Sequence, residues 1–286
     1  MLSNFRVFVI QWFSRRNLKF ILYEVHDVEL LTQYTYYTAH NRKMFDMVLK
    51  AAGKLGKDLL FPIFEEMDKY NLLLEILTPI AKSYPSEMGV QAISQGLQCL
   101  GGSGYCDDYP LEQYYRDARI HPIHEGTTGI QAMDLLGRKV IMQNGRAFEL
   151  LLSEIQAAVA VASDFPELQN HAQQLDEALS GLQEVTGHLV AIAGVKGPEY
   201  FLADATLYLE LFGIVVVAWQ WLLQGSAIQT ALNTNAKKKD LNFYHGKMTA
   251  LGYFYGYELP KTLGLTARLM HTDGLTVEIR TELFND

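Results

Sequence analysis

Apolar residues recur every three or four positions through most of this chain, which predicts a succession of amphipathic α-helices. The first such pattern spans residues 41–66, with Asn41 suited to cap the helix and Pro62 to end or kink it. The next spans residues 72–100, where Pro85 predicts a kink and a separate helical piece after it. The N-terminal third is therefore expected to be helical.

The middle of the chain alternates short helices with loops. Glycine-rich residues 101–104 stop the preceding helix, and a short helix is expected over residues 111–120. The loop 121–127 then leads to another helix, which Thr127 or Thr128 can cap. The inner face of that helix is expected to hold four apolar side chains: Ile130, Met133, Leu136 and Val140.

The second half of the chain, from about residue 146, consists of long amphipathic stretches separated by turn residues. These stretches predict roughly four more helices packed as a bundle. Only residues 275–279 alternate as a short strand would, and a frayed C-terminal tail is the alternative. The predicted fold class is all-α, a helical bundle.

Composition narrows the class of protein. The 286 residues carry a net charge of −8 and are 49% hydrophobic, which is typical of a soluble globular protein. An acidic chain argues against a nucleic-acid binder, and the basic run 237–239 is interpreted as a solvated loop. The most apolar stretch, residues 212–219, is shorter than the ~20 residues of a membrane span and predicts a buried helix. Cys99 and Cys106 form neither a disulfide framework nor a Cys-x-x-Cys motif, so we expect a cytoplasmic protein.

Two short segments could carry chemistry, and each also has an ordinary structural explanation. Residues 101–105 could let backbone N–H groups approach a phosphate, or they could form a helix C-terminal turn. Glu125 could act as a general base if partly withdrawn from water, or it could be a solvated loop residue. His121 and His124 lie three positions apart, but Pro122 prevents helical stacking, so no metal site is predicted.

Three consecutive segments together resemble the C-terminal helical domain of the acyl-CoA dehydrogenases. They are Gln98–Tyr105 (QCLGGSGY), Tyr109–Ile120 (YPLEQYYRDARI) and His124–Gln131 (HEGTTGIQ). Residues 200–223 and 244–262 resemble the C-terminal helical extension of a bacterial branch of this family, to which the 3-methylmercaptopropionyl-CoA dehydrogenases belong. The combination of segments is far more specific than any one of them.

Residues 20–24 and 41–62 resemble the N-terminal part of the same branch. In the family, further helices and a β-barrel domain separate that part from the C-terminal domain. Here the N-terminal resemblance ends near residues 67–70, and residues 72–77 already resemble the C-terminal domain. The resemblance thus implies an internal deletion and three parts: an N-terminal segment and helix (1–70), a C-terminal-type helical domain (71–145) and a helical extension (146–286).

The resemblance also implies roles for single residues. Glu125 matches the family's catalytic base, which removes the α-proton of an acyl thioester while a hydride passes to the flavin of FAD. Five further residues match positions that contact FAD, the last three of them across a subunit interface: Thr127, Gln131, Gln98, Gly101 and Gly102. His124 stands where the family usually has an aromatic residue, and Pro85 departs from the family's unbroken helix.

Two hypotheses of function follow from the resemblance. The first is an oligomeric, FAD-dependent acyl-CoA dehydrogenase that passes electrons to an electron-transfer flavoprotein. The second is a non-catalytic helical remnant, a structural or interaction protein, because proton abstraction without a hydride acceptor cannot complete the oxidation. A likeness to the DNA-associated alkylation-response members of the family is disfavoured, because the acidic chain lacks a basic stripe.

Overall fold

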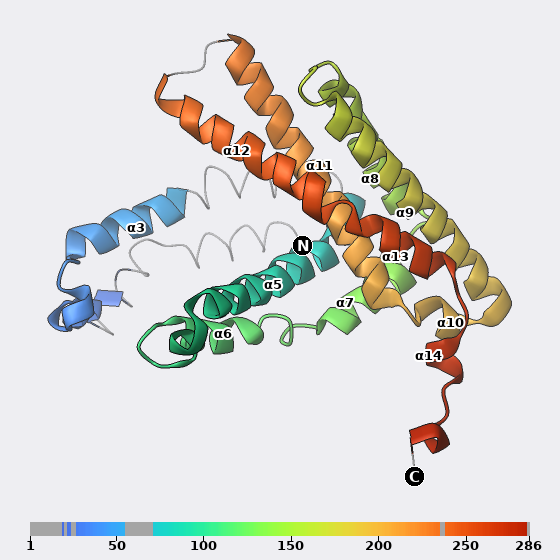
Figure 1. Cartoon of the computed structure of the whole chain (residues 1–286), viewed down its shortest axis with the longest axis horizontal. Helices are drawn as coiled ribbons and strands as arrows, with labels where there is room; N and C mark the ends of the chain where they lie inside the picture. Colours follow the sequence, from blue (N-terminus) through green and yellow to red (C-terminus); the bar gives the residue numbers. More distant parts are fainter. Residues whose placement is uncertain (1–18, 20–21, 24–26, 55–70, 235–237, 285–286) are drawn as a thin grey trace. The chain divides into compact units, whose positions relative to one another are not determined.

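The structure is a computed structural model, and it describes residue 19 and residues 22–23, 27–54, 71–234 and 238–284. Every regular element in these residues is helical, which confirms the predicted fold class (Figure 1). The chain divides into two units, residues 1–71 and residues 72–286.

The described part of the first unit contains three helical elements: η2 (Val28–Gln33), η3 (Thr35–Tyr37) and α3 (Arg42–Lys54). Asn41 caps α3 as predicted, since its side-chain oxygen accepts a hydrogen bond from the Met44 backbone N–H at 3.1 Å. No residue of α3 is buried. The rest of the predicted helix, residues 55–66 with Pro62, lies outside the described residues.

The second unit is a helical bundle that contains nearly all of the core. Its longer helices are α5 (Asn71–Leu100), α6 (Leu111–Arg119), α7 (Thr128–Asp134), α8 (Arg146–Ser163), α9 (Gln169–Lys196), α11 (Ala205–Thr234), α12 (Leu241–Tyr253) and α13 (Lys261–Met270). Shorter elements connect or follow them: η5 (Gly101–Tyr105), η6 (Leu135–Lys139), α10 (Pro198–Leu202), η7 (Lys238–Asp240), η8 (Phe254–Glu258), α14 (Leu275–Glu278) and η9 (Thr281–Phe284). The predicted turns at residues 164–166 and 259–260 fall between these elements, as expected. The turn predicted at residues 194–198 is shorter, since α9 continues to Lys196 and α10 begins at Pro198, which leaves only Gly197 between them.

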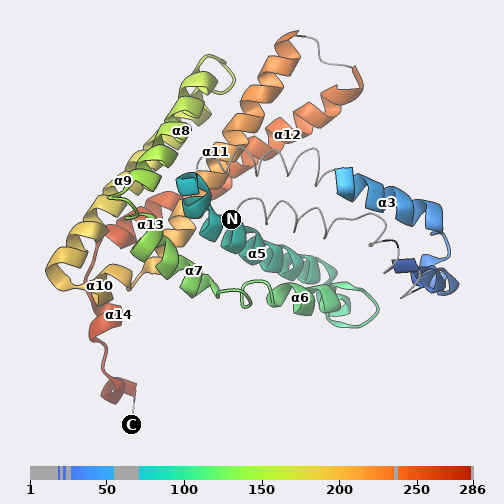
Figure 2. The same cartoon turned by 180° about the vertical axis from the view of Figure 1, so that it is seen from behind.

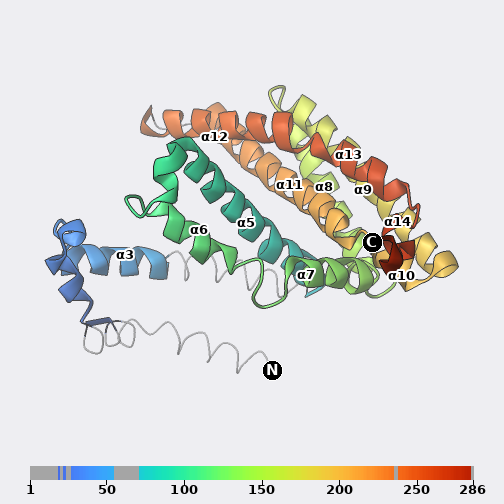
Figure 3. The ribbon, with the colours of Figure 1, turned by 60° about the horizontal axis from the view of Figure 1, so that its bottom comes forward.

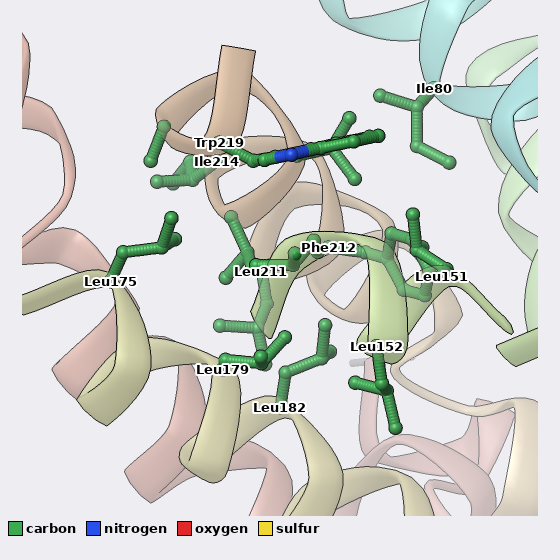
Figure 4. Packing of buried hydrophobic residues seen from close by; sticks show 14 of the residues in the cluster. Ile80, Leu151, Leu152, Leu175, Leu179, Leu182, Leu211, Phe212, Ile214 and Trp219 are labelled. Atoms are coloured by element: carbon green, nitrogen blue, oxygen red, sulfur yellow. The ribbon is translucent and has the colours of Figure 1, made fainter. Parts of the chain in front are cut away.

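Helix α11 lies at the centre of the bundle because its sequence is apolar on all sides. It packs against α7, α8, α9, α12 and α13. The rings of Tyr208 and Phe212 are fully buried with their centroids 5.8 Å apart, and Phe148 of α8 lies 5.9 Å from Phe212. Figure 4 shows apolar side chains of α8, α9 and α11 meeting in this core: Leu151, Leu152, Leu175, Leu179, Leu182, Leu211 and Phe212.

Helix α11 is also long and apolar enough, by length and composition alone, to cross a membrane. The sequence-based expectation that its apolar stretch is too short is therefore wrong, because residues 212–219 belong to a helix of 30 residues. In the bundle, 61% of the most apolar window of α11 is buried against other helices. This burial favours the prediction that residues 212–219 belong to a buried core helix.

Helix α5 runs unbroken through Pro79 and Pro85, so the separate helical piece predicted after Pro85 is wrong. Each proline removes one backbone hydrogen bond from the helix. The buried residues of α5, which are Ile76, Pro79, Ile80 and Ser83, pack into the core of the second unit around the first proline. Tertiary packing therefore offsets the local cost of Pro79, whereas the helix beyond Pro85 has only half-buried and exposed residues.

The expected inner face of α7 is only half correct. Leu136 and Val140 are buried, but the Ile130 and Met133 side chains are 53% and 43% exposed. The chain passes into a π-helical turn at η6, which changes the register of the residues that face the core. The first turns of α7 consequently present apolar side chains to solvent.

The predicted strand at residues 275–279 is a short helix, α14. It begins after Gly274, and the Leu275 backbone N–H donates to the Asp273 carboxylate at 3.0 Å. The Arg268 guanidinium, 2.8 Å from Asp273, is the largest cause that holds the pKa of that carboxyl well below its usual range. A hydrogen bond of 2.5 Å from the Tyr200 hydroxyl to Glu278 fixes the other end of α14. These polar contacts, rather than strand pairing, place the segment.

Candidate functional site

The loop that carries Glu125 joins α6 to α7 and has an unusual backbone. Glu125 adopts a φ of 53° and Gly126 a φ of 95°, both in the left-handed region. A non-glycine residue rarely adopts this conformation, because its Cβ crowds the backbone. The loop therefore turns sharply at the residue that the sequence singled out.

Hydrogen bonds from side chains outside the loop hold this turn in place. The Lys82 ammonium, on α5, donates to the backbone oxygens of His121 at 2.9 Å and Gly126 at 2.6 Å. The Gln131 side-chain amide, on α7, donates to the backbone oxygen of Glu125 at 3.2 Å. Strained backbone persists where surrounding contacts determine it, and such positions cluster at functional sites.

The start of α7 is fixed by two threonines. The Thr127 hydroxyl accepts a hydrogen bond from the Ile130 backbone N–H at 3.3 Å, which confirms the predicted cap. The Thr128 hydroxyl donates to the Glu87 carboxylate on α5. Loop and helix start are thus tied to α5 at two points, and Figure 2 shows α6 and α7 following one another along α5.

The Glu125 side chain is exposed in this structure. A general base near neutral pH was expected to need a carboxylate partly withdrawn from water. Among the described residues, none buries the Glu125 side chain. The flanking apolar side chains Ile123 and Ile130 are also exposed. The rings of His121 and His124 stand edge to face beside them, with centroids 5.5 Å apart. The Glu125 carboxylate is therefore open to solvent, and both apolar and imidazole side chains of the same loop are exposed with it.

The glycine segment at the end of α5 serves as a helix stop and also exposes its backbone. Leu100 ends α5, and Gly101 follows with a φ of 60°. Gly101 and Gly102 are exposed, and a Cβ added at Gly102 would meet no atom within 4 Å. Gln98 is exposed on the last turn of α5. A phosphate can approach the backbone here without a steric obstacle.

The structure brings together only part of the set implied by the family resemblance. Glu125, Thr127 and Gln131 lie in one loop and helix start, which contacts α5 at Glu87. Gln98 follows Glu87 by eleven positions, which is about 16 Å along a helix. Gln98, Gly101 and Gly102 therefore form a second group at the far end of α5.

The sequence did not identify Lys82 and Glu87, the two residues of α5 that position the Glu125 loop and the start of α7. Both lie on α5, about forty residues before the loop and helix start that they hold. Charged residues within a helix that is expected to pack were a signal, since a charge in a packed helix needs a partner. The sequence does not say which partner, because the contact depends on how the chain folds back.

Two family models match this chain. The acyl-CoA dehydrogenase C-terminal domain matches residues 39–158, and the "acetyl-CoA dehydrogenase C-terminal like" model matches residues 151–280. The chain belongs to the acyl-CoA dehydrogenase family. The all-helical fold agrees with this assignment, since both models describe C-terminal helical domains.

Curated relatives support the same assignment. The chain is 31% identical over 191 residues to the broad-specificity linear acyl-CoA dehydrogenase FadE5 of Mycobacterium tuberculosis, covering 65% of this chain and 31% of that protein. It is 36% identical over 183 residues to the 3-methylmercaptopropionyl-CoA dehydrogenase of Ruegeria pomeroyi, covering 64% and 30%. A shorter match, 47% over 58 residues, covers 20% of this chain and 14% of the short-chain specific acyl-CoA dehydrogenase of Rattus norvegicus mitochondria.

The chain spans about 30% of the length of the first two of these relatives. The matching models are those of C-terminal domains, and one of them begins at residue 39. The resemblance of residues 20–24 and 41–62 to the N-terminal part of the family, and the internal deletion inferred from it, therefore stay predictions. The domain boundaries at residues 70 and 145 stay predictions as well.

The family uses FAD, and some residues of this chain suit parts of that cofactor. Gly102 leaves open space beside an exposed backbone, which suits a pyrophosphate. Thr127 and Gln131 place polar side chains beside Glu125. Because the two groups are separated along α5, the residues that would contact FAD lie at two places in a single copy of the described chain rather than in one enclosed pocket.

Proposed function

We propose that this chain supplies the catalytic base and part of the FAD contacts of an acyl-CoA dehydrogenase that oxidises the α,β-bond of an acyl-CoA thioester. The observation that carries the proposal is the held left-handed turn at Glu125, in a chain of this family. An ordinary solvated loop residue needs neither a left-handed backbone nor side chains that hold it there. Glu125 has both, since Lys82 and Gln131 hold its turn by hydrogen bonds.

The chemistry of each residue follows from its position. The Glu125 carboxylate takes the α-proton of the thioester as a general base. Bound FAD supplies the hydride acceptor, which leaves a double bond between the α- and β-carbons. Lys82 and Gln131 fix the loop backbone and thereby the direction of the Glu125 side chain. Gln98, Gly101 and Gly102 of a second copy of the chain would hold the pyrophosphate and ADP part of FAD.

Completing the site requires more protein than one copy of the described chain presents. The exposed apolar residues beside Glu125 need cover, because water around the carboxylate weakens it as a base. Self-association would cover them and bring Gln98 of one copy toward Thr127 of another. We also propose that an electron-transfer flavoprotein accepts the electrons from the reduced flavin and that the protein is cytoplasmic.

We expect the chain to self-associate at micromolar concentration. Apolar side chains around the Glu125 loop and on α7 are exposed: Ile120, Ile123, Ile130 and Met133. Contiguous apolar surface of several hundred Å² is uncommon on a stable monomer. Light scattering should report a dimer or larger, and Ile123→Lys with Ile130→Lys should shift it toward monomer. A monodisperse wild-type monomer that binds no apolar dye would contradict this expectation.

The visible absorption spectrum tests the cofactor directly. Purified protein titrated with FAD should bind it, and Gly102→Val should weaken binding at least about tenfold because the branched side chain blocks the pyrophosphate. The fold should be unaffected, since the space beside Gly102 is open. Gly264→Val is the matched control, because a Cβ at that exposed glycine of α13 also meets no atom within 4 Å.

A protein that stays without flavin in excess FAD would contradict the enzyme proposal. That result would favour the alternative, a non-catalytic helical remnant that acts as a structural or interaction protein. Equal affinity of the wild-type protein and Gly102→Val would instead leave the glycine segment as a helix stop only.

A further inference from the structure

A cleft of about 360 Å³ opens in the second unit, apart from the Glu125 loop. Residues of α5 and α11 line it, with Thr128 of α7 and Lys261 at the start of α13, and Figure 3 shows these helices in the second unit. Its floor is apolar and includes Ile80, Leu209 and Ile214. Three carboxylates line its walls: Glu87, Glu210 and Glu258.

The charges of the cleft do not balance. The Lys261 ammonium donates to Glu258 at 2.5 Å, and the Thr128 hydroxyl donates to Glu87. Within the part of the chain that the structure describes, Glu210 has neither a hydrogen bond nor an ion pair. Three carboxylates therefore face one ammonium, and the cleft is negatively charged.

A buried hydroxyl group in the cleft is also without a partner among the described residues. Ser83 is 2% exposed, lines the cleft, and its Oγ makes no hydrogen bond in the described structure. Tyr84 lines the cleft beside it. Burial, followed by the Glu258 and Glu210 carboxylates, raises the pKa of Tyr84 to about 12, so its hydroxyl stays neutral. A buried hydroxyl without a partner is uncommon in a folded protein and calls for a ligand or water.

We propose that this cleft binds a small organic cation, a primary ammonium on a short aliphatic body. An ammonium has three N–H donors and no acceptor, which suits the Glu210 carboxylate, the free oxygen of Glu87 and the Tyr84 hydroxyl oxygen. The aliphatic body covers Ile80 and Ile214 on the floor and displaces water from them.

A metal ion suits the cleft less well. Among the described residues no group of three or more histidine, cysteine, aspartate or glutamate side chains is arranged to hold a metal ion. A divalent cation needs several converging oxygen ligands, and an apolar floor provides none. The carboxylates line the walls of an apolar space, which matches a cation with an apolar body.

The cleft is distinct from the proposed catalytic loop. Thr128 and Glu87, which tie the start of α7 to α5, line it, but Glu125, Thr127 and Gln131 do not. The inference therefore goes beyond the proposed function and does not depend on flavin binding or turnover. Its test needs only the folded chain.

Titration calorimetry with n-pentylammonium, 1-pentanol and pentanoate tests the charge preference. We expect the ammonium to bind and the other two to bind at least about fivefold more weakly, the scale of one exposed ion pair. Glu210→Gln should weaken ammonium binding about fivefold, since it removes the unpaired carboxylate. Glu154→Gln, at an exposed carboxylate of α8, is the matched control and should leave binding unchanged.

Binding of pentylammonium should also weaken as the salt concentration is raised, because salt screens the attraction between the ammonium and the carboxylates.

A gain of binding provides a sharper criterion. Lys261→Met removes the competing ammonium and frees Glu258, so pentylammonium should bind about fivefold more tightly. Equal binding of pentanol and pentylammonium, or no effect of either Glu210→Gln or Lys261→Met in variants with unchanged thermal midpoints, would overturn the proposal. Absence of pentylammonium binding at millimolar concentration would overturn it as well.

Discussion

Glu125→Gln should reduce acyl-CoA oxidation by at least about a hundredfold, the lower end of what a positioned general base contributes. The amide keeps the shape of the side chain and cannot accept the α-proton. Because the loop is held through backbone oxygens, the variant should keep its fold and any affinity for FAD. Reduction of an electron-accepting dye by a series of saturated acyl-CoA thioesters measures the rate.

The matched control for this experiment is Glu184→Gln, which changes an exposed carboxylate on α9. Its rate should equal that of the wild-type protein. Full activity of Glu125→Gln would remove Glu125 from the mechanism. A loss of activity together with a loss of bound flavin would show that the substitution disturbs the site as a whole rather than the base.

Phe212→Ala should cost about 3–5 kcal/mol of unfolding free energy, a large part of the stability of a typical domain. Phe212 is fully buried in α11 between the rings of Phe148 and Tyr208. Truncation leaves a cavity where three helices meet, and rigid neighbours cannot close it fully. Urea unfolding followed by circular dichroism measures the change.

Phe243→Ala is the matched control, because this phenylalanine of α12 is 61% exposed. Its unfolding free energy should change by no more than about 0.5 kcal/mol. Equal midpoints for Phe212→Ala and the wild-type protein would show that α11 is not the centre of the core.

The repeated spacing of apolar residues was sufficient to predict the all-α class, which the described residues confirm, and the turns at residues 164–166 and 259–260. Helical periodicity is a local property, and so is capping, which is why Asn41 and Thr127 were correctly identified. The family assignment also followed from the sequence, since it depends on short segments such as residues 98–105 and 124–131 rather than on contacts.

Predictions failed where packing opposes a local rule. Pro79 and Pro85 each disfavour a helix locally, yet α5 continues through both, with its buried residues from Ile76 to Ser83 packed in the bundle. Residues 275–279 alternate as a strand does, yet they form α14 because Asp273 and Tyr200 hold that segment by polar contacts. The Asp273 contact is local, but the Tyr200 contact joins residues 78 positions apart and is not encoded in the neighbouring sequence.

For the candidate site, the sequence by itself identified Glu125 and the residues of its loop, because motif identity does not depend on geometry. Only the tertiary structure determined that Glu125 adopts a left-handed backbone, that Lys82 and Gln131 hold it, and that Gln98 lies at the other end of α5. It likewise determined that Glu210 and Ser83 share a cleft, although they lie more than a hundred residues apart. The physical reason is that periodicity and capping act over a few residues, whereas these contacts form only when α5, α7 and α11 pack together.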